Sequence, residues 1–191
     1  MKRNRFFETA FLFEMGLGLA AVLIAWPLGL RLWDYCSFNP SDLGISIAAA
    51  GIAVLLYLLL RTLPFAWLRR VADIVRTIYR TEMQSLSLGQ LALLALAAGF
   101  GEELLFRGLL QQGLCNGFPE KKWEVIVAVS LLFGMAHCLT ATYAVLAFLI
   151  SLYLGGLYYW TGNLLVPIIV HALYDFFVFC HLYVEFRASK C

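Results

Sequence analysis

Six ionisable residues stand inside long apolar stretches of this 191-residue sequence. An ionised side chain inside a bilayer costs a few kcal/mol on insertion scales, so six unpaired groups imply on the order of 10 kcal/mol. Such a set persists where its members satisfy one another around a polar cavity. The candidates for a reaction site inside a membrane are therefore Glu102, Glu103, Arg107, His137, His171 and Asp175.

The spacing divides the two neighbouring glutamates between different roles. Glu103 and Arg107 are four residues apart, so they share one helical face and are predicted to form an ion pair. Glu102 is rotated by about 100° from Glu103 and therefore points elsewhere. This pairing neutralises the Glu103 carboxylate, whereas the Glu102 carboxylate stays unpaired and can take part in a reaction. We interpret Glu103 and Arg107 as support for the site.

The remaining residues favour activation of water for attack on an amide. A buried carboxylate beside a histidine can take up a proton from water, which assigns this task to Glu102 and His137. The attack creates an oxyanion that needs a hydrogen-bond donor, and His171 is suited to that role. Asp175 lies four residues beyond His171 and is expected to fix the tautomer and orientation of its ring.

In sequence order these residues form three motifs of a known family. Residues 101–108 read GEELLFRG, an EExxxR motif, residues 133–137 read FGMAH, an FxxxH motif, and residues 171–175 read HALYD, an HxxxN/D motif. Together they resemble the CPBP family (CAAX proteases and bacteriocin-processing enzymes, also called the Abi family), whose members are intramembrane glutamic endopeptidases. Any one motif would be weak, whereas three in this order are specific. The resemblance covers residues 88–186.

The resemblance implies a role for each matching residue. Glu102 matches the catalytic glutamate, which activates water together with His137. His171 and Asp175 match the positions that form the oxyanion hole in the prenyl-protease branch. The second glutamate and the arginine of the EExxxR motif match the pair that supports the site. The chain departs from the prenyl-protease branch at Asp175, where that branch has Asn, so a direct donor role for this residue stays open.

Three other interpretations of the polar residues remain. Glu102, His137 and His171 could ligate a catalytic zinc, although no HExxH is present and that set leaves no free glutamate as a base. A non-catalytic immunity or scaffold protein could keep the same polar network for packing. A proton-coupled transporter is disfavoured because the sequence has no visible inverted repeat. We expect neither a metal nor another cofactor.

The resemblance also defines the expected partners. The substrate would be a membrane-associated protein or peptide that carries a lipid, a leader or a sorting signal, and the lipid bilayer is the second partner. No stripe of basic residues with interleaved aromatics supports binding of nucleic acid. The short length and the family imply an enzyme of a bacterial plasma membrane.

Membrane-spanning helices must position the candidate residues. The chain is 62% hydrophobic and 14% charged, against about half and about a quarter in soluble domains, which excludes a soluble class. About 20 apolar residues suffice to cross a bilayer. We predict an all-α, polytopic membrane bundle in a single domain (1–191), with a catalytic core in 88–186. Six spans are predicted, at residues 9–30, 43–64, 88–114, 123–140, 141–160 and 164–183.

Three further features of these elements bear on the site. Residues 61–86 are predicted to form an amphipathic helix in the interface, with its arginines toward the headgroups. The candidate residues fall at different depths of straight spans, so kinks at Gly99, Gly101 and Gly108 are expected to align them. For Glu14, in the first span, two positions are equally consistent with the sequence: contact with the polar cavity, or the edge of the membrane.

The distribution of basic residues predicts the orientation. With the N-terminus inside, the outer side holds only Arg31, Lys121 and Lys122. Both termini are therefore expected in the cytoplasm, with His181 and Glu185 at the inner interface. The inner set comprises Lys2, Arg3, Arg5, Arg61, Arg69, Arg70, Arg76, Arg80, Arg187 and Lys190.

Overall fold

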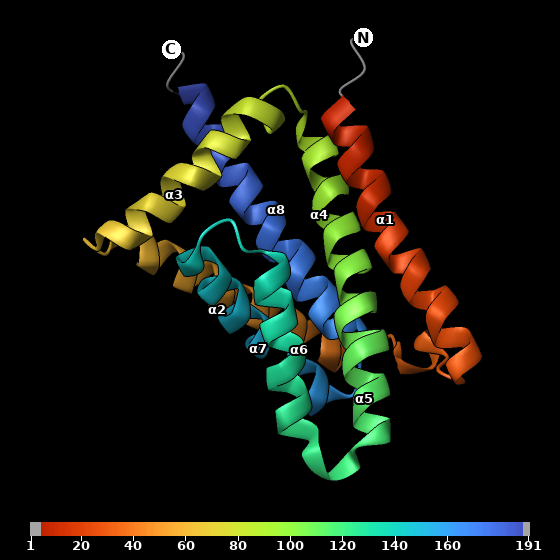
Figure 1. The fold of residues 1–191 in the computed structure, drawn as a ribbon. Helices are drawn as coiled ribbons and strands as arrows, with labels where there is room; N and C mark the ends of the chain where they lie inside the picture. Colours follow the sequence, from red (N-terminus) through yellow and green to blue (C-terminus); the bar gives the residue numbers. More distant parts are fainter. Residues whose placement is uncertain (1–4, 189–191) are drawn as a thin grey trace.

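The structure, a computed structural model, describes residues 5–188, and every regular element in that range is helical. The predicted all-α class is therefore confirmed (Figure 1). The helices are α1 (Arg5–Ala25), α2 (Pro40–Thr62), α3 (Ala66–Ile78), α4 (Leu88–Glu103), α5 (Gln112–Gly117), α6 (Lys122–Ala136), α7 (Ala141–Thr161) and α8 (Leu165–Ala188). Short 3-10 turns are η1 (Trp26–Leu28), η2 (Leu32–Tyr35) and η5 (Pro119–Lys121), and π-helical stretches are η3 (Tyr79–Met83) and η4 (Leu104–Gln111).

Within the described residues, five segments are long and apolar enough to cross a membrane. They overlap five of the six predicted spans, and they are Arg5–Leu28, Pro40–Thr62, Leu88–Gly117, Ala141–Thr161 and Leu165–Ala188. The other predicted span corresponds to α6, whose 15 residues are fewer than the about 20 that cross a bilayer, so its crossing stays a prediction.

The predicted orientation rests partly on residues that the structure does not describe. Lys2, Arg3 and Lys190 lie outside the described range. The start of α1 and the end of α8 lie at the same end of the bundle (Figure 1). Which side of a membrane that end faces stays a prediction.

Local signals determine where the helices beside the site begin and end. Ser87 and Gln90 form a capping box at the start of α4, in which each side chain bonds the other residue's backbone N–H. The hydroxyl of Thr140 accepts a hydrogen bond from the Tyr143 backbone N–H at the start of α7 (3.1 Å). Helix α7 ends at Gly162, whose φ of 64° lies in the left-handed region that favours glycine.

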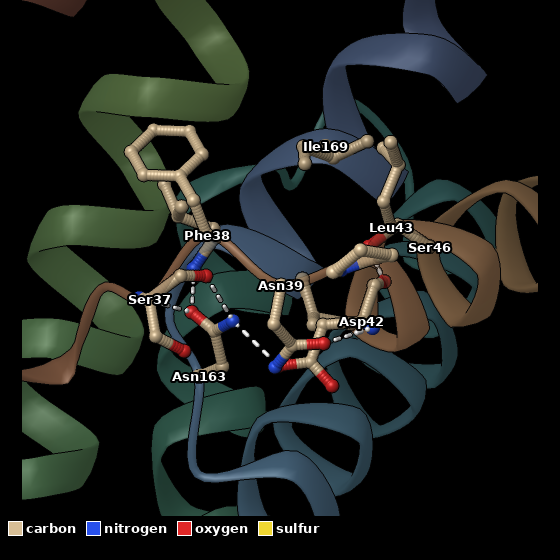
Figure 2. A pocket seen from close by; sticks show the side chains of 11 residues that line it. Ser37, Phe38, Asn39, Asp42, Leu43, Ser46, Asn163 and Ile169 are labelled. Carbon is tan, nitrogen blue, oxygen red and sulfur yellow. Dashed lines mark hydrogen bonds between the residues drawn. The ribbon is translucent and has the colours of Figure 1, made fainter.

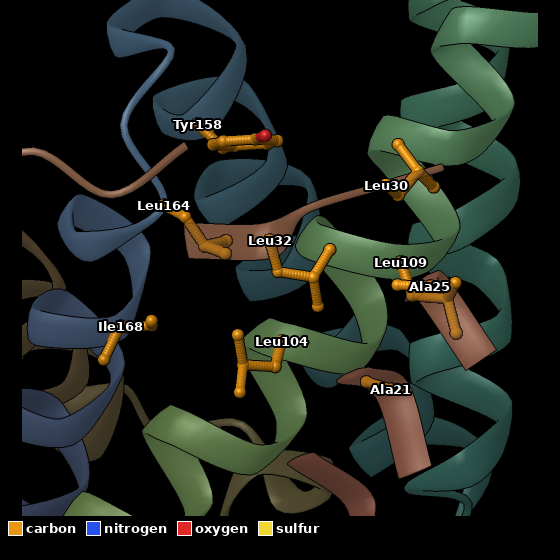
Figure 3. Packing of buried hydrophobic residues seen from close by; sticks show 9 residues of the cluster. All are labelled: Ala21, Ala25, Leu30, Leu32, Leu104, Leu109, Tyr158, Leu164 and Ile168. Carbon is orange, nitrogen blue, oxygen red and sulfur yellow. The ribbon is translucent and has the colours of Figure 1, made fainter. Parts of the chain in front are cut away.

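Helix α4 occupies the centre of the bundle and packs against both α1 and α8 (Figure 1). A buried apolar cluster joins α1, η4, the segment between η1 and η2, η2 itself, α7 and the start of α8. Figure 3 shows Leu32, the first residue of η2, close to Leu104 and Leu164. Because lipid tails are as apolar as leucine, close packing is what holds such helices together. The cluster comprises Ala21, Ala25, Leu30, Leu32, Leu104, Leu109, Tyr158, Leu164 and Ile168.

Two glycines let α4 approach its neighbours closely. A Cβ atom on Gly99 would come within 2.9 Å of backbone atoms of Ile168 and Ala172 on α8. A Cβ atom on Gly101 would overlap the backbone carbonyl of Glu14 on α1. The α-helical assignment of α4 runs through both glycines and ends at Glu103, so the predicted kinks at these positions stay a prediction. The glycines are points of contact between helices, as small residues commonly are in membrane bundles.

The departure from regular α-helix follows these glycines, in η4. This π-helical stretch starts directly after Glu103 and contains both Arg107 and Gly108. A Cβ on Gly108 would lie 3.2 Å from the Leu164 side chain, so this glycine too is a point of packing. Single π-helical turns inside α-helices are frequent at functional sites. Here the turn changes the direction of the side chains just beyond the two glutamates.

The predicted amphipathic helix is present as α3 and η3, with Leu68 buried and Arg69 exposed. Two of the arginines in the predicted segment form ion pairs within the bundle. Arg76 Nε donates to Glu185 Oε1 of α8 at 2.8 Å, and Arg61 Nη2 at the end of α2 donates to Glu185 Oε2 at 3.1 Å. A carboxylate can accept from two guanidinium groups at once, so Glu185 ties α2, α3 and α8 together.

Candidate active site

Glu102, Glu103 and Arg107 lie in the interior of the bundle, at the junction of α4 and η4. Their exposed fractions are 8%, 0% and 0% respectively. Arg107 Nη1 donates to Glu103 Oε1 at 3.0 Å, so the predicted ion pair is confirmed. Because a buried charge is stable only when it is paired, these two residues form one neutral unit.

The guanidinium of Arg107 also ties this pair to α6 and α7. Its Nη2 donates to the backbone carbonyl and to the hydroxyl of Ser151, each at 2.8 Å. Its Cζ lies 5.2 Å from the centre of the Phe133 ring. Further along η4, Gln111 Nε2 donates to the Gly155 carbonyl at 3.0 Å. Sequence reasoning missed Ser151 and Gln111, because no spacing rule connects residues on separate helices.

His137 meets Glu102 from the end of α6. Its Nε2 lies 3.6 Å from Glu102 Oε1. Its Nδ1 lies 2.9 Å from the carbonyl oxygen of Phe133, which is only an acceptor, so Nδ1 carries the hydrogen in the neutral ring. The imidazole also stacks on the Phe133 ring, with centroids 4.2 Å apart. These contacts leave Nε2 as an acceptor that faces the free carboxylate.

His171 is held by Glu103 across the contact between α4 and α8. Its Nδ1 lies 2.8 Å from Glu103 Oε1, whereas its Nε2 lies 3.6 Å from Asp175 Oδ2. The first distance is that of a hydrogen bond and the second is longer than one. The i,i+4 spacing assigned the orienting role to Asp175, which does face the ring, and the structure adds Glu103 as a closer partner on the other nitrogen. The supporting carboxylate thus joins Arg107 to His171.

Two residues outside the three motifs also face the site. Glu14 on α1 contacts Gly101, and its carboxyl group lies within electrostatic range of the four candidate catalytic residues. The phenol of Tyr143, in the first turn of α7, lies within electrostatic range of Glu102 and Asp175. Glu14 gave a signal in the sequence, as an acidic residue within a span, and the structure places its backbone against Gly101 with one buried carboxyl oxygen that has no hydrogen-bond partner. Tyr143 gave none.

The candidate residues are not arranged as one set of metal ligands. In residues 5–188 no group of three or more His, Cys, Asp or Glu side chains is arranged to hold a metal ion. His137 faces Glu102, and His171 instead bonds Glu103. The zinc set of Glu102, His137 and His171 is therefore split between two separate contacts.

A separate cavity of about 420 Å³ lies between the start of α2 and the start of α8. Figure 2 shows the Asn163 amide at its edge, where Nδ2 donates to the Ser37 carbonyl at 2.7 Å and to Asp42 Oδ2 at 2.8 Å. None of the candidate catalytic residues lines it. Its polar groups satisfy one another, and they fasten the turn between α7 and α8 to the start of α2.

Comparison with known proteins identifies the family. Residues 84–177 match the family of type II CAAX prenyl endopeptidase Rce1-like proteins. The chain is also 30% identical over 159 residues to the uncharacterized protein YpbD of Bacillus subtilis (strain 168), an alignment that covers 82% of this chain and 76% of that protein. This chain belongs to the Rce1-like family. No solved structure matches this Rce1-like protein.

Membership in the Rce1-like family agrees with the three motifs, all of which lie inside the matched residues. It supports a CAAX-type intramembrane protease, and the five apolar segments agree with a multi-pass membrane protein. The matched region begins just before α4 and ends within α8. Glu14 lies outside this region, so its place at the site comes from the tertiary structure.

Proposed function

We propose that this Rce1-like protein is an intramembrane endopeptidase that hydrolyses a peptide bond with water activated by Glu102 and His137. The observation that carries the proposal is the approach of His137 Nε2 to Glu102 Oε1, at 3.6 Å, next to a fully buried ion pair. That ion pair neutralises Glu103 with Arg107. Glu102 is thereby left as the carboxylate that is free to accept a proton.

The proposed first step follows from the donors and acceptors of these two side chains. With its hydrogen on Nδ1, His137 presents an acceptor at Nε2, and the Glu102 carboxylate is also only an acceptor. The two atoms are too far apart for a direct hydrogen bond, and a water molecule beside them would donate one hydrogen to each. As the water oxygen bonds to the carbonyl carbon, the π electrons of the carbonyl move to its oxygen and one water proton passes to this pair. That proton then goes to the amide nitrogen as the carbon–nitrogen bond breaks, which leaves a carboxylic acid and an amine.

His171 is the proposed donor to the oxyanion. Its Nδ1 is occupied by Glu103, so Nε2 is the nitrogen that remains for the substrate. Donation there requires a second hydrogen on the ring, for which the Asp175 carboxylate is the counter-charge. In this proposal the Asp175 carboxylate balances the positive charge of the His171 ring and limits the position of that ring. A preorganised donor of this kind typically contributes about 10²- to 10³-fold to turnover.

The proposed substrate is a membrane-associated protein or peptide that carries a lipid, a leader or a sorting signal. A lipid-bearing chain is supported by the family, whose description names CAAX prenyl endopeptidases. The proposed setting is the plasma membrane of a bacterium, with both termini in the cytoplasm. The proposed partners are this substrate and the bilayer, with no nucleic acid.

The test compares cells that carry the wild-type protein, Glu102→Gln or Glu124→Gln. The last variant is the matched control, because Glu124 is an exposed carboxylate on α6. Peptides of the membrane and secreted proteomes are quantified in all three. We expect at least one protein to accumulate uncut with Glu102→Gln and to be processed normally with Glu124→Gln. Identical processing with all three proteins would rule out the protease function.

A further inference from the structure

Glu14 is a half-buried residue on the side of α1 that packs closest to α4. Glu14 and Gly18 are four residues apart and therefore share one face of α1. A Cβ on Gly18 would lie 3.3 Å from the Cα of Gly101, and a Cβ on Gly101 would overlap the Glu14 carbonyl. The backbones of α1 and α4 are thus in contact at the residue directly before Glu102.

Each of these two carboxyl groups has one buried oxygen without a partner. Glu102 Oε1 faces His137, but Glu102 Oε2 has no hydrogen-bond partner among the described residues. The same holds for Glu14 Oε2. Buried polar atoms are nearly always satisfied, so each such atom needs an explanation. Because the Glu14 backbone contacts the residue directly before Glu102, each of these two oxygens can be the partner that the other lacks.

The charges around Glu14 come from three neighbouring parts of the fold. The charged groups nearest to the Glu14 carboxyl group are Glu102 on α4, His171 and Asp175 on α8, and His137 at the end of α6. Two ionised carboxylates buried side by side repel each other strongly, which is relieved when one of them carries a proton. A protonated carboxyl group is also a donor, and an ionised one is only an acceptor.

We propose that Glu14 is a positioning residue of this site, which shares one proton with Glu102 Oε2 directly or through one water molecule. The O–H of Glu14 donates to Glu102, and no bond is broken in the resting enzyme. This hydrogen bond holds the Glu102 carboxylate so that Oε1 stays turned toward His137. The consequence for turnover rests on the proposed protease function, whereas the proton sharing does not.

Infrared spectroscopy of the purified protein in lipid nanodiscs tests the proton sharing without any substrate. The carbonyl stretch of a protonated carboxyl group is compared at neutral pH for the wild type, Glu14→Gln, Glu102→Gln and the control Glu124→Gln. We expect this band in the wild type and in the control, its loss in Glu14→Gln, and a shift or loss in Glu102→Gln. A wild type without the band, or a band unchanged in Glu14→Gln, would overturn the proposal.

A second measurement follows the effect on the reaction, with the peptide that accumulates uncut in Glu102→Gln cells as the probe. Loss of a hydrogen bond to a charged group corresponds to about a tenfold or greater fall in kcat for Glu14→Gln, with KM little changed. Glu14→Asp keeps the acid and is expected to recover part of the loss. Equal kcat for Glu14→Gln and wild type would refute the positioning role. A wild type that cleaves nothing but shows the band would instead refute the protease function alone.

Discussion

Replacing Arg107 with leucine probes the buried network on which the site is built. The substitution removes three hydrogen bonds of 2.8 to 3.0 Å, one to Glu103 and two to Ser151. It leaves the fully buried Glu103 carboxylate with His171 as its remaining partner. Removing one partner of a buried ion pair costs about 3–5 kcal/mol. We expect a loss of this size in the free energy of unfolding.

The assay is unfolding of the purified protein in mixed micelles by titration with a denaturing detergent, followed by circular dichroism. Arg70→Leu is the matched control, because Arg70 is exposed on α3 and surface substitutions usually change stability by roughly 0.5 kcal/mol or less. The double variant Glu103→Leu with Arg107→Leu removes both charges and is expected to cost less than the sum of the single variants. Additive losses, or equal losses for Arg107→Leu and Arg70→Leu, would refute the reasoning.

Four further predictions address other parts of the molecule. Gly101→Ala should lower the free energy of unfolding by about 1–3 kcal/mol because α1 must move, whereas Gly16→Ala, which meets no atom within 4 Å, should be neutral or stabilising in the same unfolding titration. His137→Gln should reduce kcat for the accumulated peptide by about 10²-fold or more, and an unchanged kcat would contradict its role with Glu102. Cleavage should survive EDTA and 1,10-phenanthroline, and a loss that zinc restores would favour the metal alternative. Glu185→Gln should weaken the attachment of α3 to α8 by about 1 kcal/mol or less, since both ion pairs of Glu185 are partly exposed. The measurement is limited proteolysis, which should be faster at residues 63–65 in the variant.

Contacts within one helix were predictable from spacing. Glu103 and Arg107 pair as expected because helix geometry places residues four apart on one face. The same rule places Asp175 beside His171, at 3.6 Å, but the shorter contact of His171, at 2.8 Å, is with Glu103 on another helix. A residue on another helix can be closer than a neighbour on the same helix once the backbones approach at a glycine.

Glycines and charged residues inside the predicted spans marked special positions, but the sequence did not show what each of them contacts. Gly99 and Gly101 indicated a special position of α4, and kinks were the expected reason, but the structure shows close contact with α8 and α1. Glu14 could belong to the site or to the membrane edge, and only the packing of α1 on α4 distinguishes the two. The arginines around α3 followed an amphipathic pattern, yet Glu185 binds two of the basic residues there.

The sequence by itself determined the all-helical membrane class, most of the spans, the three motifs and the ion pair, because hydropathy and helical period are local properties. The tertiary structure alone decided that His137 Nε2 faces Glu102, that Glu103 joins Arg107 to His171, and that Ser151 and Gln111 hold η4 to α7. These contacts depend on how closely separate helices approach and how each is rotated about its axis. Packing of the whole bundle sets both quantities, and no spacing along the chain encodes them.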